Sequence, residues 1–163
     1  MKPLSLQSTR ILWLIHIIAM IAWVGGIAAN LLLQAVTVPL GEHALLGVYN
    51  SIHTIDVYII RNGALGLLLT GFFYGVTTNW GFFKFRWIAV KWILFIMQMG
   101  FGIFYIGKLT ELNYKMVTAS TVGLLSNPMF VNNLQAIIVS QTLQLLGLIL
   151  VIILSKYKPW GKR

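Results

Sequence analysis

The fold of this chain is decided by the stretch Ile11–Leu33, which reads ILWLIHIIAMIAWVGGIAANLLL. Only two strongly polar side chains, His16 and Asn30, interrupt it. A helix needs about 20 mostly apolar residues to cross the hydrocarbon core of a bilayer. The stretch is also too long for the apolar core of a secretory signal peptide. It therefore predicts a membrane-spanning helix that the mature chain retains.

The rest of the chain has the composition of a membrane protein. Of its 163 residues 58% are hydrophobic and 9% are charged, whereas soluble domains carry about 25% charged residues. Three more apolar stretches are long enough to cross a bilayer, at residues 57–78, 87–107 and 134–155. We expect an all-α fold, an integral membrane four-helix bundle that forms a single transmembrane domain over residues 1–163.

The content of cysteine and of charge narrows the possible functions. The chain has no cysteine, which excludes disulfides, thiolate metal sites, iron–sulfur clusters and a cysteine nucleophile. Its net charge of +9 would indicate a nucleic-acid partner in a soluble domain. In a chain this apolar, positive charge instead records membrane topology, and we expect no nucleic-acid partner.

Positive charge is distributed unequally between the two sides of the predicted bundle. The side with both termini carries eight basic residues and no acidic one: Lys2, Arg10, Lys84, Arg86, Lys156, Lys158, Lys162 and Arg163. The opposite side carries Lys108, Lys115, Glu42, Asp56 and Glu111. Cytoplasmic loops are the ones enriched in lysine and arginine. The sequence therefore predicts a multi-pass protein of the cell membrane, in the setting of a bacterial inner membrane, with both termini in the cytoplasm.

The two connections on the outer side are long, and we expect helix there as well. Residues 41–53 place Leu45, Val48, Tyr49 and Ile52 at helical spacing. The second helix is therefore expected to begin outside the bilayer. The third is expected to continue beyond Lys108 until the break at residues 126–128. The inner connection, residues 79–86, is short and aromatic and is typical of a tight turn at the membrane interface.

Besides Arg61, near the start of the second span, two ionisable side chains inside the predicted spans need an explanation. His16 lies roughly 9 Å below the cytoplasmic end of the first span, and Lys91 enters the third span from the same side to nearly the same depth. Such groups usually face a partner or a cavity. Structural explanations are an imidazole bonded to a neighbouring backbone and a lysine that reaches back to the headgroups. Functional explanations are an axial haem ligand at His16, and a propionate partner or proton donor at Lys91.

Other residues extend this pattern along the helices. Met20 shares a face with His16, Trp23 lies one turn further on, and Gly25 and Gly26 follow. Small residues let a second helix or a flat ligand approach closely.

Polar side chains also occur at mid-membrane depth and at the outer surface. Gln98, Gln141 and Gln144 favour hydrogen bonds between helices, with a polar cavity or a quinone pocket as the alternative. His53 and its neighbours Asp56 and Arg61 indicate a solvated charge cluster at the outer surface. The alternative is a second haem site at His53, near the opposite membrane face from His16.

Short motifs on all four predicted helices resemble known membrane families. The segment His16–Gly26, HIIAMIAWVGG, resembles the His-…-Trp-x-Gly-Gly signature of CopD-like membrane proteins and the His-…-Trp-x-x-Gly signature of HemJ-type protoporphyrinogen oxidases. Leu69–Thr70–Gly71 resembles the Leu-Thr-Gly of their second helix, and Lys91, four residues after Trp87, occupies the place of a family lysine. The ending Lys158–Pro159 is similar to the tail of small integral membrane proteins of unassigned function.

The resemblance implies a four-helix bundle with a redox or transport role. In HemJ-type proteins the histidine that matches His16 binds haem b, and the lysine that matches Lys91 is needed for activity. CopD-like proteins are associated with copper uptake. After its glycines this chain reads Ile27–Ala28–Ala29–Asn30, which departs from the tyrosine, proline and arginine pattern of the oxidase.

We therefore expect a haem b-binding membrane redox protein, with a protoporphyrinogen-oxidase-like activity as one possible reaction. His16 is the expected metal ligand; Met20, Trp23 and Gly26 are expected to shape the pocket; Lys91 is expected to bind the cofactor or to act in catalysis. Electrons would pass to or from a quinone or a respiratory-chain partner. The alternatives are a small metal or cation transporter or channel subunit, and a structural subunit of a membrane complex. A homodimer within the lipid bilayer is compatible with each.

Overall fold

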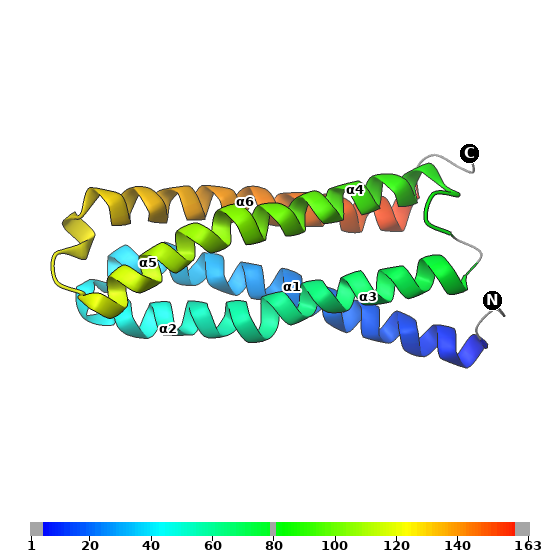
Figure 1. Ribbon diagram of the computed structural model, residues 1–163, viewed down its shortest axis with the longest axis horizontal. Helices are drawn as coiled ribbons and strands as arrows, with labels where there is room; N and C mark the ends of the chain where they lie inside the picture. The colour runs from blue at the N-terminus through cyan, green and yellow to red at the C-terminus, as the bar shows by residue number, and fades with distance from the viewer. Residues whose placement is uncertain (1–4, 79–80, 159–163) are drawn as a thin grey trace.

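The computed structural model describes residues 5–78 and 81–158, and it is an all-helical bundle (Figure 1). Within these ranges there is no β-strand, and four helices are long and apolar enough to cross a membrane. They comprise Leu6–Leu40, Glu42–Thr77, Arg86–Ala119 and Pro128–Tyr157. The expected multi-pass, all-α bundle is thus confirmed at the level of helix number and length.

Two of the four long helices are built from several segments. The first and last are continuous, as α1 (Leu6–Leu40) and α6 (Pro128–Tyr157). The second consists of η1 (Glu42–Ala44), α2 (Leu45–Ile55), a π-helical turn η2 (Asp56–Ile60) and α3 (Arg61–Thr77). The third consists of α4 (Arg86–Phe101), a π-helical turn η3 (Gly102–Ile106) and α5 (Gly107–Ala119). A short turn, η4 (Leu124–Ser126), precedes α6.

Local sequence signals set several helix ends. The Ser5 hydroxyl caps α1 by accepting a hydrogen bond of 3.1 Å from the Ser8 amide. Gly41, with φ of +78°, ends α1 in a conformation that side chains other than glycine rarely adopt. Asn127 caps α6 by accepting from the Met129 amide at 2.9 Å, and Pro128 follows at the first helical position.

The long outer segments are helical, as the sequence predicted. The second helix begins at Glu42, well before residue 57, and the third continues to Ala119, well beyond Lys108. The expected break at residues 126–128 is also present. Among the residues used in the sequence argument, Lys2, Pro159, Lys162, Arg163 and the first two residues of the inner connection, 79–80, lie outside the described ranges.

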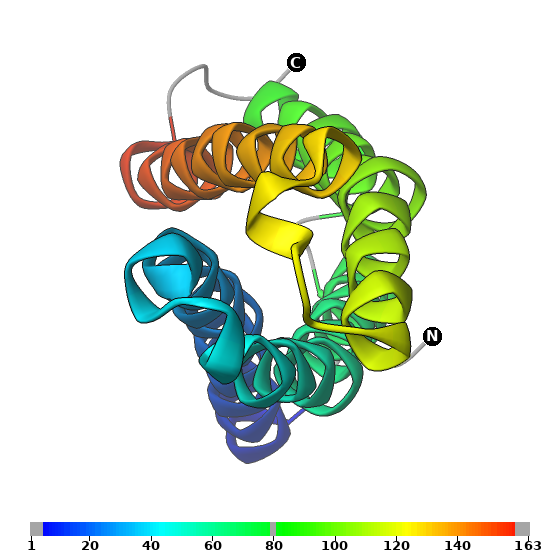
Figure 2. The same cartoon turned by 90° about the vertical axis from the view of Figure 1, so that its left-hand side faces the viewer.

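The long helices form two packed pairs, which diverge at one end of the molecule. Helix α1 packs on α3, α4 packs on α6, and contacts of α1 with α6 and of α2 with α5 join the pairs. The first turn of α1 and the last turn of α6 lie at the same end, which we call the terminal end (Figure 1). Near this end α1 and α3 separate from α4 and α6 (Figures 1 and 2). The other end, which we call the loop end, is crossed by the connection between α5 and α6 (Figure 2).

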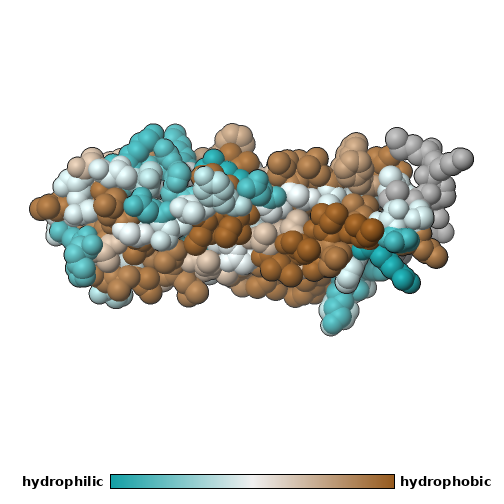
Figure 3. All heavy atoms as spheres, turned by 90° about the horizontal axis from the view of Figure 1, so that it is seen from below, coloured by the Kyte–Doolittle hydropathy of each residue, from teal (hydrophilic) through white to brown (hydrophobic). Residues whose placement is uncertain are grey.

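Two clusters of buried apolar side chains hold the bundle together. The outer cluster, near the loop end, contains Leu45, Val48, Tyr49, Ile52, Val117, Leu124, Phe130 and Leu134. The inner cluster, toward the terminal end, contains Ala19, Trp23, Ile27, Ala64, Leu67 and Leu148. The side formed by α1, α2 and α3 is mostly apolar toward the terminal end and more mixed toward the loop end (Figure 3). Such an apolar exterior is expected where a helix faces lipid.

Candidate functional site

His16 is held in one orientation by a hydrogen bond between α1 and α3. Its Nδ1 lies 2.7 Å from the hydroxyl oxygen of Thr70. That hydroxyl donates its own proton to the carbonyl oxygen of Gly66, 2.6 Å away on the preceding turn. Because a hydroxyl has a single proton, we assign Thr70 as the acceptor at this contact and the ring proton of His16 to Nδ1. The other ring nitrogen, Nε2, then has a free lone pair, which is the form of imidazole that binds metals.

Close packing of α1 on α3 brings His16 within reach of Thr70. A Cβ atom added to Gly63 would lie 2.6 Å from the backbone nitrogen of Trp23 and 3.0 Å from the carbonyl oxygen of Ala19. Because both atoms belong to the backbone of α1, only glycine allows the two helices to approach this closely. Gly63 therefore positions Thr70, two turns further along α3, opposite the imidazole.

Lys91 brings a positive charge to the same region from the other helix pair. It projects from α4, is partly buried, and lies close enough to His16 for the two side chains to interact electrostatically. Within the described ranges it forms neither an ion pair nor a hydrogen bond, since the ion pairs there join Arg61 to Asp56 and Lys115 to Glu111. A partly buried ammonium group without an anion is costly, and it favours the binding of an anionic group beside it.

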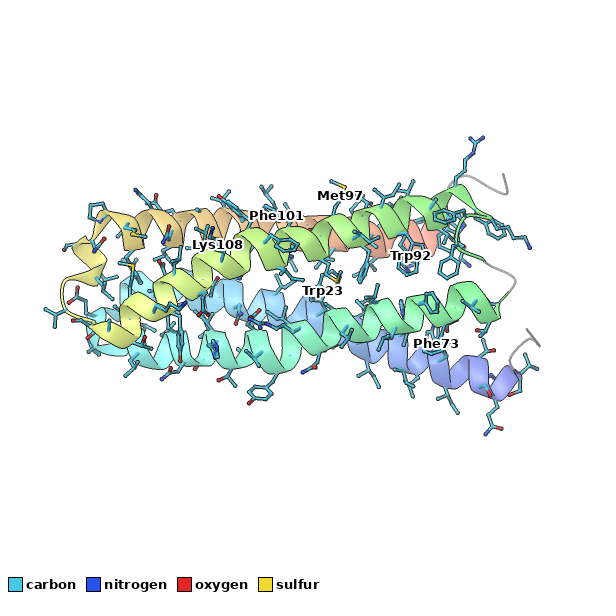
Figure 4. All side chains as sticks on the ribbon, viewed as in Figure 1. Trp23, Phe73, Trp92, Met97, Phe101 and Lys108 are labelled. Atoms are coloured by element: carbon cyan, nitrogen blue, oxygen red, sulfur yellow. The ribbon has the colours of Figure 1, made fainter. Side chains whose placement is uncertain are left out.

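Aromatic side chains lie beside His16 and at the contact between the two pairs. The ring of Tyr74 meets the His16 imidazole edge to face, with centroids 5.9 Å apart. Trp23 of α1 contacts Phe95 of α4 at 5.3 Å, and Phe95 in turn contacts Trp92 at 6.1 Å. Trp23 and Trp92 are labelled in Figure 4, which also shows Met97 pointing away from the bundle. Tyr74 thus contacts the histidine directly, and the Trp23–Phe95–Trp92 chain links α1 to α4.

The remaining residues predicted for the site lie in the inner cluster, in a helix contact or on the surface. Met20 is partly buried and packs against the inner cluster beside Trp23. Gly26 lies in a helix contact, because a Cβ atom there would come within 2.7 Å of Ile60 on the π-helical turn η2. Its surface is thus covered by the Ile60 side chain, and its expected role in shaping the pocket stays a prediction. Gly25, its neighbour, is exposed and has nothing within 4 Å of an added Cβ atom.

The outer charge cluster has the structural character expected of it. Asp56 and Arg61 form an ion pair of 2.7 Å, and the Arg61 side chain is largely exposed. The ring of His53 stacks on Tyr114 with centroids 4.6 Å apart. Among the described residues no group of three histidine, cysteine, aspartate or glutamate side chains could hold a metal ion. A metal centre at His16 would therefore take at most two ligands from the described side chains of these types.

The three mid-membrane glutamines differ in the contacts that their side chains make. The Gln144 side-chain nitrogen on α6 donates to the backbone carbonyl of Gln98 on α4 at 3.0 Å, so the expected bond between helices is confirmed there. The Gln98 side chain lies against Gly147 of α6, where an added Cβ atom would overlap its amide nitrogen. Gln141 is buried, and its side-chain oxygen has no hydrogen-bond partner in the described structure.

Sequence reasoning missed the role of Thr70 and a buried polar network around Tyr49 and Asn113. Thr70 appeared only as part of a short motif, and nothing in the sequence indicated that it would face His16, 54 positions away. For Asn113, a weak signal was available: it is an amide in an otherwise amphipathic helical segment, three positions from both Thr110 and Met116.

The residues present fit a haem group in their chemistry. The open imidazole nitrogen of His16 would bind the iron, and the ammonium group of Lys91 would pair with a propionate carboxylate. The surrounding aromatic side chains match the apolar faces of a porphyrin.

Comparisons with known proteins identify no relative of this chain, so the functional proposal depends on the residues described above. No family model, no curated protein and no solved structure is significantly similar to this chain. The resemblance to CopD-like and HemJ-type proteins thus rests on the short motifs quoted above, two of which contain His16 and Thr70.

Proposed function

We propose that this protein binds haem b in the membrane and takes part in electron transfer, with Nε2 of His16 as an axial ligand. The observation that carries the proposal is the bond from His16 Nδ1 to a hydroxyl whose own proton is already donated to Gly66. This arrangement leaves Nε2 as the free nitrogen and fixes the plane of the ring. Metal-binding histidines are usually oriented in this way, by a partner at their second nitrogen.

Each neighbouring residue has a role that follows from its position. Thr70 orients the imidazole, and Lys91 would pair with a propionate or hold a proton near it. Trp23 and Phe95, in edge-to-face contact at 5.3 Å, exclude water from the inner side of the site. When bound, haem supplies one-electron redox chemistry, which a quinone or a respiratory-chain partner would complete. A protoporphyrinogen-oxidase-like reaction would use the same set of residues.

The decisive measurement is the visible absorption spectrum of the purified protein, oxidised and reduced with dithionite. We expect a Soret band, with sharp α and β bands on reduction, from protein produced in haem-replete cells. His16→Ala should purify folded and colourless. His53→Ala is the matched control and should keep the spectrum, because that ring stacks on Tyr114 far along the bundle. A His16→Ala protein with full haem content would overturn the assignment.

Lys91 provides a second, independent test. Lys91→Met removes the charge while keeping much of the side-chain volume, and we expect weaker haem retention during washing with detergent. Lys91→Arg keeps the charge and should restore retention at least in part. Equal haem retention in all three proteins would remove Lys91 from the site and leave the His16 assignment standing.

We also propose that both termini face the cytoplasm. Arg10, Lys84, Arg86, Lys156 and Lys158 belong to the start of α1, the connection between α3 and α4, and the end of α6. Those three segments lie at the terminal end of the bundle (Figure 1). The positive-inside rule then supports a cytoplasmic terminal end. Green fluorescent protein fused to the C-terminus should fluoresce, and alkaline phosphatase fused after Val122 should be active; the reverse pattern would invert the topology.

A further inference from the structure

Basic side chains are concentrated on one helix pair, α4 and α6, at the terminal end of the bundle. Lys84 lies just before α4 and Arg86 is its first residue, while Lys156 and Lys158 lie at the end of α6. All four are exposed, and together they form what we call the basic foot. Among the described residues of the other pair, α1 contributes only Arg10 to this end and α3 contributes no basic residue. The two pairs separate there (Figures 1 and 2).

A cation–π contact joins the two halves of the basic foot. Lys158 ends α6 with a φ of +45°, and its ammonium nitrogen lies 6.0 Å from the centroid of the Trp87 ring. Trp87 directly follows Arg86 on α4, so the charge of Lys158 lies beside the first turn of α4. Lys84 and Lys156 are each two positions along the chain from one of these two basic residues. Positive charge from both helices is therefore gathered on one part of the surface.

The acidic side chains of the protein are engaged elsewhere. The chain has three of them, Glu42, Asp56 and Glu111, and they belong to η1, η2 and α5. Asp56 pairs with Arg61, Glu111 pairs with Lys115, and Glu42 accepts hydrogen bonds from backbone amides at the loop end. The basic foot is therefore an excess of positive charge, which favours an anion from outside the chain.

The helix dipoles account for only part of the basic foot. Lys156 and Lys158 lie at the C-terminus of α6, where the partial negative charge of the helix stabilises a cation. Arg86 lies at the opposite kind of helix end, where the partial positive charge disfavours a cation, and the first turn of α4 has no acidic residue. The stability of α4 thus does not explain why Arg86 is basic.

Aromatic side chains beside the basic foot indicate the depth at which it lies. Phe83 and Tyr157, the sequence neighbours of Lys84 and Lys156, are 65% and 74% exposed. Tyrosine and tryptophan gather at the membrane–water interface, where their rings lie among the lipid headgroups. The two exposed rings and Trp87 therefore favour a lipid over a water-soluble acidic partner. The anion available at headgroup depth is the phosphate of a phospholipid.

We propose that the basic foot binds the headgroup of an anionic phospholipid, whose phosphate is held by Arg86 of α4 and Lys156 of α6. A guanidinium group can bind two phosphate oxygens at once, and a lysine adds a compact charge. Basic residues next to a membrane-spanning helix attract anionic lipids in this way. The inference goes beyond haem binding and is independent of it. It also holds whichever side of the membrane the terminal end faces.

The test measures lipid binding to the purified full chain by native mass spectrometry. The probes are phosphatidylglycerol, which is anionic, and phosphatidylcholine, which is zwitterionic and carries the same acyl chains. We expect phosphatidylglycerol to bind more tightly, and its advantage to shrink as the ammonium acetate concentration rises. Equal binding of the two lipids would overturn the proposal and leave an acidic protein as the partner for these charges. Inorganic phosphate in excess should not displace phosphatidylglycerol; displacement would assign the basic foot to free phosphate and overturn the lipid assignment.

Paired neutral substitutions locate the site. Arg86→Gln combined with Lys156→Gln removes one charge from each helix. We expect the affinity for phosphatidylglycerol to fall about 25-fold, which is about fivefold for each basic side chain. Lys108→Gln combined with Lys115→Gln is the matched control, because it removes two exposed positive charges from α5 and should leave the affinity unchanged.

Phosphatidylcholine serves as the check on folding in both double variants. Its binding should stay at the wild-type level, because it depends on the apolar exterior of the bundle and not on the basic foot. Equal losses of phosphatidylglycerol affinity in the two double variants would show that only the net charge of the chain matters, and would overturn the site.

Discussion

The side-chain amide of Gln144 on α6 donates a 3.0 Å hydrogen bond to the backbone carbonyl of Gln98 on α4. The side chain of each glutamine also lies over a glycine of the facing helix. Gln144 lies over Gly102 of η3, where an added Cβ atom would come within 2.7 Å of its nitrogen, and Gln98 lies over Gly147 of α6. Each helix thus places an amide in the gap left by a glycine of the other. Gly102 begins the π-helical turn η3, so the irregular turn lies at this contact.

Loss of this interaction should weaken the α4–α6 pair measurably. We expect Gln144→Leu to lower the free energy of unfolding by about 1 kcal/mol, the usual value of a polar contact between membrane helices. The measurement is thermal unfolding of the detergent-purified variant. Gln135→Leu, an exposed position on the same helix, is the control and should leave the Tm unchanged. Equal effects at both positions would mean that the bond contributes nothing specific.

The contact of α1 with α3 should depend on Gly63 and tolerate change at Gly25. Gly63→Ala places a methyl group against backbone atoms of Trp23 and Ala19, so we expect a loss of about 2 kcal/mol or more. Gly25→Ala adds the same methyl group where nothing lies within 4 Å, and it should be neutral or slightly stabilising. Tm values of the two variants check the pair. A well-tolerated Gly63→Ala would show that the helices separate more easily than this packing implies.

Glu42 should hold the loop end of the bundle closed. Its carboxylate accepts hydrogen bonds from the backbone amides of Gly123, at 2.9 Å, and Leu125, at 3.2 Å, in the connection that crosses this end. We expect Glu42→Ala to lower stability by about 1–3 kcal/mol, since these bonds are made to a charged group. Hydrogen exchange should show that the amides of Gly123 and Leu125 lose protection.

Glu111 is the matched control for Glu42. It pairs with Lys115 at 3.3 Å on the surface of α5, an arrangement worth about 0.3–0.5 kcal/mol. Glu111→Ala should therefore change neither the Tm nor the exchange of the loop amides appreciably. Similar losses in the two variants would indicate a general effect of negative charge at the loop end.

Thr70 should act on haem binding through His16. Thr70→Val removes the acceptor for the Nδ1 proton, and we expect haem affinity to fall about 10–100-fold, as is typical when the partner of a metal-binding histidine is lost. Thr70→Ser keeps the hydroxyl and should restore affinity. Haem titration of the apoprotein, followed at the Soret band, measures both variants. Unchanged affinity in Thr70→Val would mean that the hydroxyl does not orient the ligand.

Much of the bundle could be read from the sequence, because a membrane-spanning helix is a local property. About 20 apolar residues suffice to cross the hydrocarbon core, whatever the rest of the chain does. The helical extension before residue 57 was likewise visible in the spacing of Leu45, Val48, Tyr49 and Ile52, all of which are buried. The end of the α5–α6 connection was marked by Asn127 and Pro128, a helix cap and a first-turn residue.

The tertiary structure decided which side chains meet. Successive side chains on a helix point about 100° apart, and the position of the next helix cannot be read from the sequence. Gly25 and Gly26 are adjacent and chemically identical, yet Gly26 is covered by Ile60 and Gly25 faces outward. His16 and Asn30 both interrupt the first apolar stretch. Packing against α3 gives His16 a hydroxyl partner and an open nitrogen, whereas packing against α2 gives Asn30 a carbonyl partner and an open oxygen. The stretch placed both side chains inside the membrane, and only the neighbouring helices determined what each can bind.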